Sequence, residues 1–236
     1  GKRVAKKKPI LVLKTGRSEQ GAKAAVSHTG SMVGKDEVYE AAFRQSGLLR
    51  VSDFDELKDV VRAFLYLPLM KGTRVGVITL TGAGGIMAAD ACEKFGLKLV
   101  NFSPQCGERM ENLSPPWQDI GNPLDIAPAT SVMGHPRTEV YQAALQSILG
   151  EQEVDGLLFI SGVLGRGKAW DPSSAAIETA EMYKDKPVVF WCYGHYAPEV
   201  IAKLEMTGKI LAYPSAERAV RVLSRLAEYS QFLEGN

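Results

Sequence analysis

RVGVITLTGAGGIMAADACEKFGLKLV (74–100) carries the strongest fold signal in the chain, because a strand, a turn, a helix and a second strand follow one another directly. RVGVITL (74–80) is a short, mostly apolar run, which is typical of a buried strand. GIMAADACEKFG (85–96) has apolar residues recurring at intervals of three and four, as an amphipathic helix requires. The stretch therefore predicts two parallel strands joined by a helix.

Segments of both kinds alternate along the rest of the chain. The other apolar runs are PILVLK (9–14), LLRV (48–51), GLLFIS (156–161), PVVFWCY (187–193) and KILAY (209–213). Helical periodicity recurs in EVYEAAFRQSG (37–47), FDELKDVVRAFLYL (54–67), TEVYQAALQSILG (138–150), SSAAIETAEMY (173–183) and SAERAVRVLSRLAEYSQFL (215–233). This alternation predicts an α/β protein of flavodoxin-like, doubly wound domains with mostly parallel sheets.

Small polar residues and glycines indicate where several of these helices begin and end. The predicted N-caps are Asp36, Ser52 or Asp53, and Ser215, and the predicted C-terminal glycine caps are Gly47, Gly96 and Gly150.

The segment LPLMKGT (67–73) interrupts a helix with proline and glycine, so we expect a domain boundary there. The predicted division is a first domain at 1–67, a linker at 68–72 and a second domain at 73–236. The first part has only two predicted strands, and two parallel strands cannot cover both faces of a sheet. We therefore expect the first domain to be truncated, with its earlier strands elsewhere.

Composition excludes several classes of protein. The 236 residues carry a formal net charge of +1, so no strong field favours nucleic acid or an anionic membrane as partner. No apolar run reaches the roughly 18 residues of a membrane span, and a cytoplasmic location is expected. The three cysteines, far apart and never in a C-x-x-C spacing, predict neither a disulfide framework nor a metal site.

The glycine-rich turn that ends the 74–80 strand predicts a phosphate site. Glycines let the backbone approach an anion, and the first N–H groups of a helix supply donors. The competing dinucleotide fingerprint fails, because Met87 replaces its third glycine and Asn101 replaces its acidic residue. A purely structural tight turn stays open as an alternative. The candidate phosphate-binding residues are Gly82, Ala83, Gly84, Gly85 and Ile86.

A second candidate segment is KTGRSEQGAKAAVSHTGSMVGKD (14–36), which is polar, rich in small residues and expected to form a loop. His28 lies within it and is not part of an apolar periodicity, so a core role is not indicated. A neutral imidazole can accept a phosphoryl group and pass it on. Ser27, Thr29 and Gly30 are candidate phosphate-binding neighbours of His28. A structural histidine is the alternative.

Together these segments resemble a known family. KKPILVLKTGRSEQGAKAAVSHTGSMVGKDEVYEAAFRQSGLLRV (7–51) resembles the second half of the phosphohistidine domain of NDP-forming acyl-CoA synthetases, the group that includes ADP-forming acetyl-CoA synthetases and the succinyl-CoA ligase alpha subunit. The stretch 74–100 looks like the family's other ligase domain. Further matches follow in the same order at GNPLDIAP (121–128), VDGLLFISG (154–162), KPVVFWCY (186–193) and YPSAERAVRVLSRLAEY (213–229).

The resemblance implies an acid–thiol ligase that interconverts acid, CoA and ATP with acyl-CoA, ADP and phosphate. His28 would carry the phosphoryl group as the catalytic residue, and the helix after Gly82 would be one of two that cradle it. Asn122 and Asp125 correspond to a segment near the phosphate site, although capping and turn formation explain them equally well.

The resemblance also implies what this chain needs from elsewhere. No permanently bound cofactor and no metal site are expected, since CoA, ATP or ADP, phosphate and Mg are substrates of the full enzyme. Most of them would bind to CoA-binding and ATP-grasp domains or subunits outside this chain, so the chain alone should be inactive. An oligomer is expected. The alternative function is a non-catalytic, CoA-ligase-like regulatory module. The acid, and the choice between ADP and GDP, do not follow from the sequence.

Overall fold

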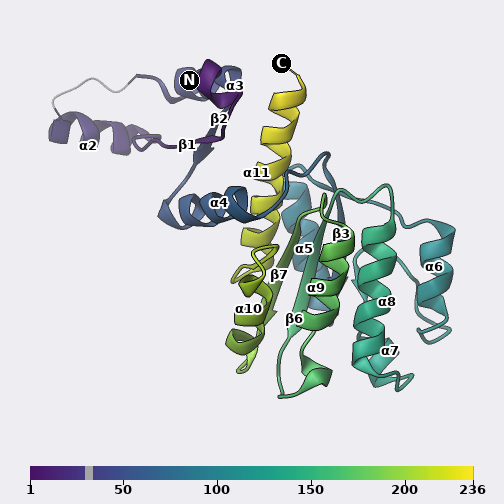
Figure 1. Cartoon of the computed structure of the whole chain (residues 1–236). Coiled ribbons are helices and arrows are strands. Elements are labelled where there is room, and N and C mark those ends of the chain that lie inside the picture. Colours follow the sequence, from purple (N-terminus) through teal and green to yellow (C-terminus); the bar gives the residue numbers. More distant parts are fainter. Residues whose placement is uncertain (30–33, 236) are drawn as a thin grey trace.

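The computed structural model describes residues 1–29 and 34–235, which form a small and a large parallel sheet (Figure 1). Every strand pair among the described residues is parallel, and helices cover both faces of the large sheet. The predicted α/β class with mostly parallel sheets is therefore confirmed.

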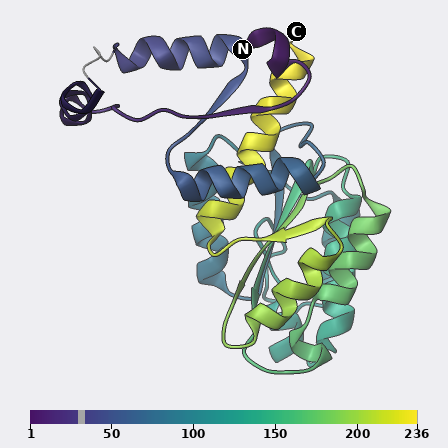
Figure 2. The same cartoon turned by 60° about the vertical axis from the view of Figure 1, so that its left-hand side comes forward.

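The small sheet pairs β1 (Ile10–Leu13) with β2 (Leu48–Val51), in a register that places Ile10 opposite Leu48. In the chain, α1 (Lys2–Ala5) precedes β1, and α2 (Glu19–Thr29) and α3 (Asp36–Ser46) lie between β1 and β2. Both views show α2 projecting away from the large sheet (Figures 1 and 2). The segment 14–36 is thus not a simple loop, because α2 occupies its middle.

The large sheet has the strand order β4-β3-β6-β7-β8. A short strand, β5 (Leu124–Asp125), pairs with the carboxyl end of β3, whereas β4 pairs with its beginning. The other strands are β3 (Arg74–Thr79), β4 (Lys98–Leu99), β6 (Gly156–Gly162), β7 (Val188–Tyr193) and β8 (Ile210–Ala212). All the apolar runs named above form strands, and β5 is the strand that the apolar pattern missed.

Two hydrophobic layers enclose the large sheet because side chains of its strands alternate between the faces. One face packs against α6 (Pro104–Glu111), α7 (Ala127–Ser131), α8 (Arg137–Gly150), α9 (Ser173–Met182) and α10 (Ala197–Met206). The other packs against α4 (Phe54–Tyr66), α5 (Gly82–Lys94) and α11 (Ala216–Glu234). A 3₁₀ turn, η1 (Lys168–Trp170), follows β6.

The small sheet is joined to the large unit through α4 and α11. The Arg225 guanidinium of α11 donates to the backbone oxygen of Arg50 at 2.9 Å and to Glu56 Oε1 at 2.9 Å. Glu56 also accepts from the Ser52 N–H at 2.8 Å, and the Tyr229 hydroxyl donates to the Ala5 oxygen at 2.8 Å. Val60 and Ala63 of α4 are fully buried in the large core. The boundary expected at 68–72 stays a prediction.

Most of the expected caps are present. Asp53 accepts from the Glu56 N–H at 2.7 Å, so of the two alternatives Asp53, and not Ser52, is the N-cap of α4. Ser215 accepts from the Arg218 N–H at 3.2 Å, so this predicted N-cap is confirmed. Gly47 and Gly96 have left-handed φ values of 67° and 71°, as expected after a helix. The predictions for Asp36 and Gly150 were wrong, because the first lies inside α3 and the second inside α8.

Candidate functional site

The turn between β3 and α5 leaves several backbone N–H groups open. The Thr79 hydroxyl donates to the Thr81 oxygen at 2.7 Å and accepts from the Thr81 N–H at 3.1 Å, which fixes the turn. Thr81 is the N-cap of α5, but its side chain makes no capping hydrogen bond. The N–H groups of Gly82, Ala83 and Gly84 therefore have no acceptor within the helix. This helix start can bind an anion.

The three glycines of the turn have different roles. A Cβ on Gly84 would lie 3.0 Å from Thr81 Cγ2 and 3.1 Å from Ile160 Cγ2, and a Cβ on Gly85 would lie 3.2 Å from Pro123 Cβ. At Gly82 the nearest atom would be 4.0 Å away. The inner two glycines thus allow α5 to pack closely on the sheet. Only Gly82 faces open space where an anion can approach.

Ala83 and Ile86 complete the predicted set at this helix start. Ala83 is exposed, and the Ile86 side chain is 66% exposed. The backbone of the first turn can therefore be reached from solvent. Of the five residues expected to form the turn site, two are buried packing positions and three are accessible.

Asp125 lies beside this helix start, since β5 pairs it with Thr79 at the end of β3. Its Oδ1 accepts from the Ala127 N–H at 2.9 Å, and its Oδ2 is the atom that a Cβ on Gly82 would approach. Burial raises the pKa of the Asp125 carboxyl, against the opposing effect of the Ala127 hydrogen bond. A carboxyl group thus lies beside the open start of α5.

Asn122 holds the neighbouring segment in place. Its Oδ1 accepts from the Val77 N–H at 3.0 Å, and its Nδ2 donates to the backbone oxygens of Val75 at 2.8 Å and Val100 at 3.0 Å. Because the amide is fully engaged with strand backbone, any support it gives to a phosphate is indirect. Asn122 fixes the position from which Asp125 reaches the turn.

Two residues near this turn were not anticipated from the sequence. Thr79 shapes the turn through its hydroxyl, and the threonines on either side of Leu80 were the available signal. The Gln118 Nε2 donates to the backbone oxygen of Asp125 at 2.6 Å, while the buried Gln118 Oε1 has no hydrogen-bond partner among the described residues. Nothing in the local sequence distinguishes Gln118 from an ordinary polar loop residue.

His28 lies in the last turn of α2 and is exposed. The helix begins after Ser18, whose hydroxyl accepts from the Gly21 N–H at 3.1 Å, and Lys23 pairs with Glu19 at 2.8 Å. The expectation that His28 is outside the core is confirmed, and the expectation of a loop is wrong. Ser27 precedes His28 in α2 and is also exposed, Thr29 ends the helix, and Gly30 lies outside the described residues.

The structure does not bring the two candidate segments together. Both views show α2 projecting from the small sheet, away from α5 and the large sheet (Figures 1 and 2). His28 and the turn at Gly82 are therefore separate halves of the expected site in this arrangement.

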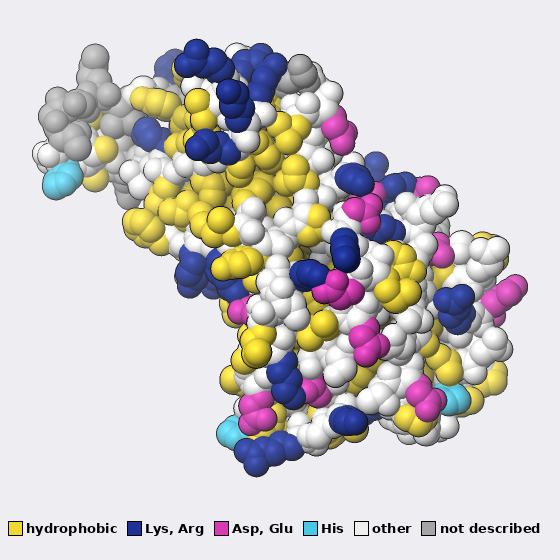
Figure 3. All heavy atoms as spheres, viewed as in Figure 1, with side chains coloured by type: hydrophobic (Ala, Val, Ile, Leu, Met, Phe, Trp, Pro, Cys, Tyr) yellow, Lys and Arg dark blue, Asp and Glu magenta, His cyan; other side chains and the backbone are white. Residues whose placement is uncertain are grey.

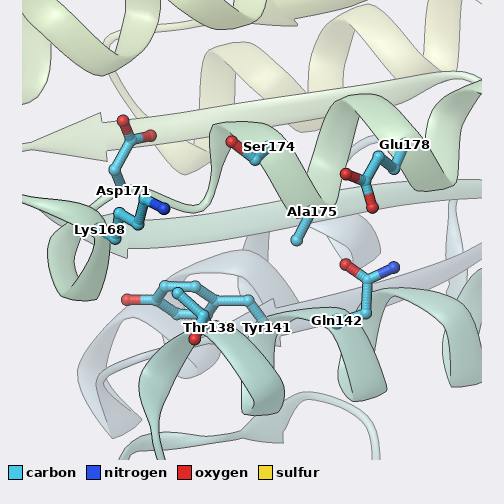
Figure 4. A pocket seen from close by; sticks show the side chains of 8 residues that line it. All are labelled: Thr138, Tyr141, Gln142, Lys168, Asp171, Ser174, Ala175 and Glu178. Carbon is cyan, nitrogen blue, oxygen red and sulfur yellow. The ribbon is translucent and has the colours of Figure 1, made fainter.

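A third feature is a polar groove between α8 and α9, with a volume of about 300 Å³ (Figure 4). Asp171 on its wall is paired with Lys203, and the Tyr141 hydroxyl donates to the Ala169 oxygen at 3.1 Å. These helices cover the face of the sheet opposite α5, so the groove is separate from the turn at Gly82. Its lining residues are Thr138, Tyr141, Gln142, Lys168, Asp171, Ser174, Ala175 and Glu178.

The cysteines behave as core residues. Cys92, Cys106 and Cys192 are all free and buried, and burial raises the pKa of the Cys92 thiol to about 12. Within residues 1–29 and 34–235, no cluster of three or more His, Cys, Asp or Glu side chains could hold a metal ion. None of the helices in those same ranges combines the length and apolar character needed to cross a membrane.

Comparison with known proteins matches two families in succession. Residues 1–64 match the succinyl-CoA ligase-like flavodoxin domain, and residues 75–232 match the Ligase-CoA domain. The alpha subunit of acetate–CoA ligase [ADP-forming] I from Pyrococcus furiosus is 39% identical over 98% of this chain and 49% of its own length. Acetate–CoA ligase [ADP-forming] II from Archaeoglobus fulgidus is 36% identical over 95% of this chain and 33% of its own length.

A solved structure is similar over almost the whole chain. The dinucleotide-forming acetyl-coenzyme A synthetase 1 of Ca. Korarchaeum cryptofilum, in complex with phosphate and ADP, superposes with a TM-score of 0.84 at 28% identity. The match covers 99% of this chain and 50% of that one. The chain thus spans about a third to a half of the relatives it matches.

Proposed function

Because this chain belongs to the Ligase-CoA domain family, we propose that it is part of an NDP-forming acyl-CoA synthetase. The full enzyme would interconvert acid, CoA and ATP with acyl-CoA, ADP and phosphate. The observation that carries the proposal is the open start of α5, an anion site in a chain similar throughout to ADP-forming ligases. Residues 1–29 and 34–235 show no feature that favours the regulatory alternative.

The proposed chemistry uses three displacements in the direction of thioester synthesis. A neutral His28 nitrogen attacks the γ-phosphorus of ATP, releasing ADP and forming a phosphohistidine. A carboxylate oxygen of the acid then attacks that phosphorus, which frees the imidazole and gives an acyl phosphate. Finally the CoA sulfur attacks the acyl carbon, forming the thioester and releasing inorganic phosphate. The imidazole gives up a proton when it is phosphorylated and takes one up again when the phosphoryl group leaves. The thiol proton of CoA passes to solvent or to a neighbouring base.

In this scheme α5 stabilises the transferring group. Its first N–H groups and the helix dipole meet the phosphoryl oxygens, and preorganised donors of this kind lower the barrier of phosphoryl transfer. Asp125 modulates the local charge, and Asn122 holds Asp125 in place. Since α2 lies apart from α5, His28 would reach this helix start by movement of the small unit or from another copy in an assembly.

The remaining substrates require partners. We propose that CoA-binding and ATP-grasp domains or subunits supply those sites, as expected from the sequence. Hydrophobic side chains gather around the small sheet on one face of the molecule (Figure 3). On α4, Phe54 is 78% and Leu65 71% exposed. An apolar surface of this kind supports contact with another domain. The expected cytoplasmic location belongs to this proposal, because its substrates are intracellular metabolites.

The test is detection of the covalent intermediate. The ligase that contains this chain is incubated with ATP and Mg²⁺, digested under mildly alkaline conditions, and examined by mass spectrometry for an acid-labile phosphoryl group on the peptide that contains His28. Addition of the acid and CoA should discharge it. A wild-type enzyme that makes thioester while His28 stays unmodified would refute the phosphohistidine route.

A further inference from the structure

Arg50 contacts both ends of the chain segment that contains His28. Its Nη2 donates to the backbone oxygen of Lys14 at 3.2 Å and to Asp36 Oδ1 at 2.5 Å. Its Nη1 donates to Asp36 Oδ2 at 3.0 Å and to Glu40 Oε2 at 3.1 Å. Lys14 follows β1, and Asp36 begins α3. One guanidinium thus holds together the two ends of the segment, the first next to β1 and the second at the start of α3.

The Arg50 side chain is built into the fold. It is only 6% exposed, and β2 places it opposite Val12 of β1. The hydrogen bond to Asp36 is the largest effect raising the pKa of Arg50, and the same bond lowers the pKa of Asp36. A buried guanidinium in a bidentate ion pair has a defined position, unlike an exposed pair that solvent screens.

The attachment of α3 depends on this contact because no residue of the helix is buried. Val38, an apolar residue of α3, is 64% exposed. The face that meets the sheet consists of Asp36, Tyr39, Glu40 and Phe43. Lys14 Nζ lies 4.7 Å from the centre of the Tyr39 ring, and Arg50 lies 5.9 Å from that of Phe43. Two cations, Lys14 and Arg50, therefore lie against aromatic side chains of α3, none of which is fully buried.

We propose that Arg50 is a positioning residue for His28, fixing the point about which the His28 segment is anchored. The clamp joins Lys14, which follows β1, to Asp36, the first residue of α3, and so fixes where the segment that carries His28 is anchored. Loss of the clamp lets α3 move and spreads His28 over positions from which phosphoryl transfer does not occur. This role rests on the proposed function.

The test combines hydrogen exchange with single-turnover phosphorylation of His28 by ATP in the assembled ligase. Arg50→Met should speed exchange of the α3 amides by about tenfold. It should slow phosphorylation by roughly 10–100-fold, the range expected from a small misplacement, at unchanged KM for ATP. Arg50→Lys should recover part of the rate, since an ammonium keeps an ion pair but cannot bridge both ends. Asp36→Asn, a change at an accessible position, should give an intermediate result even if Arg50→Met folds poorly.

Arg44→Met is the matched control. Arg44 also pairs with Glu40, at 3.9 Å, but its side chain is 79% exposed and contacts neither end of the segment. Both exchange and rate should stay at wild-type values. If the wild type is phosphorylated on His28 and both Arg50→Met and Asp36→Asn are phosphorylated at the wild-type rate, the positioning role is wrong and the proposed function stands. A wild type without phosphohistidine overturns the proposed function together with this role, whereas the exchange measurement still reports on the clamp.

Discussion

Alanine at Gly82 and alanine at Gly84 should have opposite effects, because one position is open and the other is packed. A Cβ at Gly84 would lie 3.0 Å from Thr81 Cγ2 and 3.1 Å from both Ile160 Cγ2 and Thr79 Oγ1. Overpacking of this kind costs about 1–3 kcal/mol, partly offset by the gain of about 0.4–1 kcal/mol from a less flexible unfolded chain. A net loss of about 1–2 kcal/mol would lower Tm by roughly 2–8 °C in a chain of this size.

At Gly82 the same substitution should not lower the free energy of unfolding, but it should lower the rate of His28 phosphorylation. The nearest atom to a new Cβ is Asp125 Oδ2 at 4.0 Å, so Gly82→Ala should leave Tm unchanged or slightly raised. The added methyl group obstructs the N–H groups that would hold the phosphoryl oxygens. Loss of one such contact costs roughly 10²–10³ in rate, and partial obstruction should therefore slow His28 phosphorylation by roughly tenfold or more.

Thermal unfolding and single-turnover phosphorylation of the assembled ligase measure the two effects separately. Gly107→Ala is the control, because Gly107 lies in α6 with nothing within 4 Å of a new Cβ. It should be at least as stable as wild type and fully active. A stable Gly82→Ala variant that is phosphorylated at the wild-type rate would show that α5 is not the cradle.

Three further predictions concern residues around the two candidate segments. His28→Ala should abolish thioester formation yet change stability by less than about 0.5 kcal/mol, since His28 is exposed; retention of a tenth of wild-type turnover would exclude an obligatory phosphohistidine. Asp125→Asn should raise Tm at pH 7 and tighten phosphate binding. Because burial raises the pKa of Asp125, ionisation of this carboxyl destabilises the folded wild type as pH rises above 3.8, so the Tm values of wild type and variant should converge below that pH. A Tm difference that does not change with pH would contradict this origin. The 236-residue chain alone should form no thioester from acid, CoA and ATP, and turnover of about 1 per second or faster would refute the proposed division of sites.

Strands and long helices could be predicted because their signals are local. Apolar runs predicted β3, β6 and β7, and helical periodicity predicted α11. Ser215 was predicted as a cap, and Asp53 was one of two alternatives with Ser52. The sequence also contained unused signals. Ser103 caps α6 and Pro104 begins it, while α10 has Pro198 in its first turn. The helix α2 was hidden by Gly21 and its polar composition, although Ser18 and the Glu19–Lys23 pair favour it.

The roles of the site residues were harder to predict because they depend on distant partners. Gly84 and Gly82 look equivalent in the sequence, and only the contact with Ile160 of β6 makes one of them a packing position. Asn122 has the composition of a turn, yet its amide bridges the backbones of Val75 and Val100. Asn122 lies two residues before β5, which pairs with β3, and no local pattern reveals either contact.

The two candidate segments differ in how they are held, and the difference suits a carrier and its cradle. None of the described side chains from Glu19 to His28 is buried, and α3 buries none either. The helix α5 instead has Gly84, Gly85, Ala88, Ala91 and Cys92 buried against the sheet. Elements with little buried surface open at low free energy, whereas core helices open only with the whole domain. A phosphoryl carrier that moves between partners requires an element that opens at low free energy. Preorganised hydrogen-bond donors require a helix that is fixed in the core. The ion pairs of Arg50 allow an exposed segment to keep a defined position, because they anchor its two ends and leave the residues between them unburied.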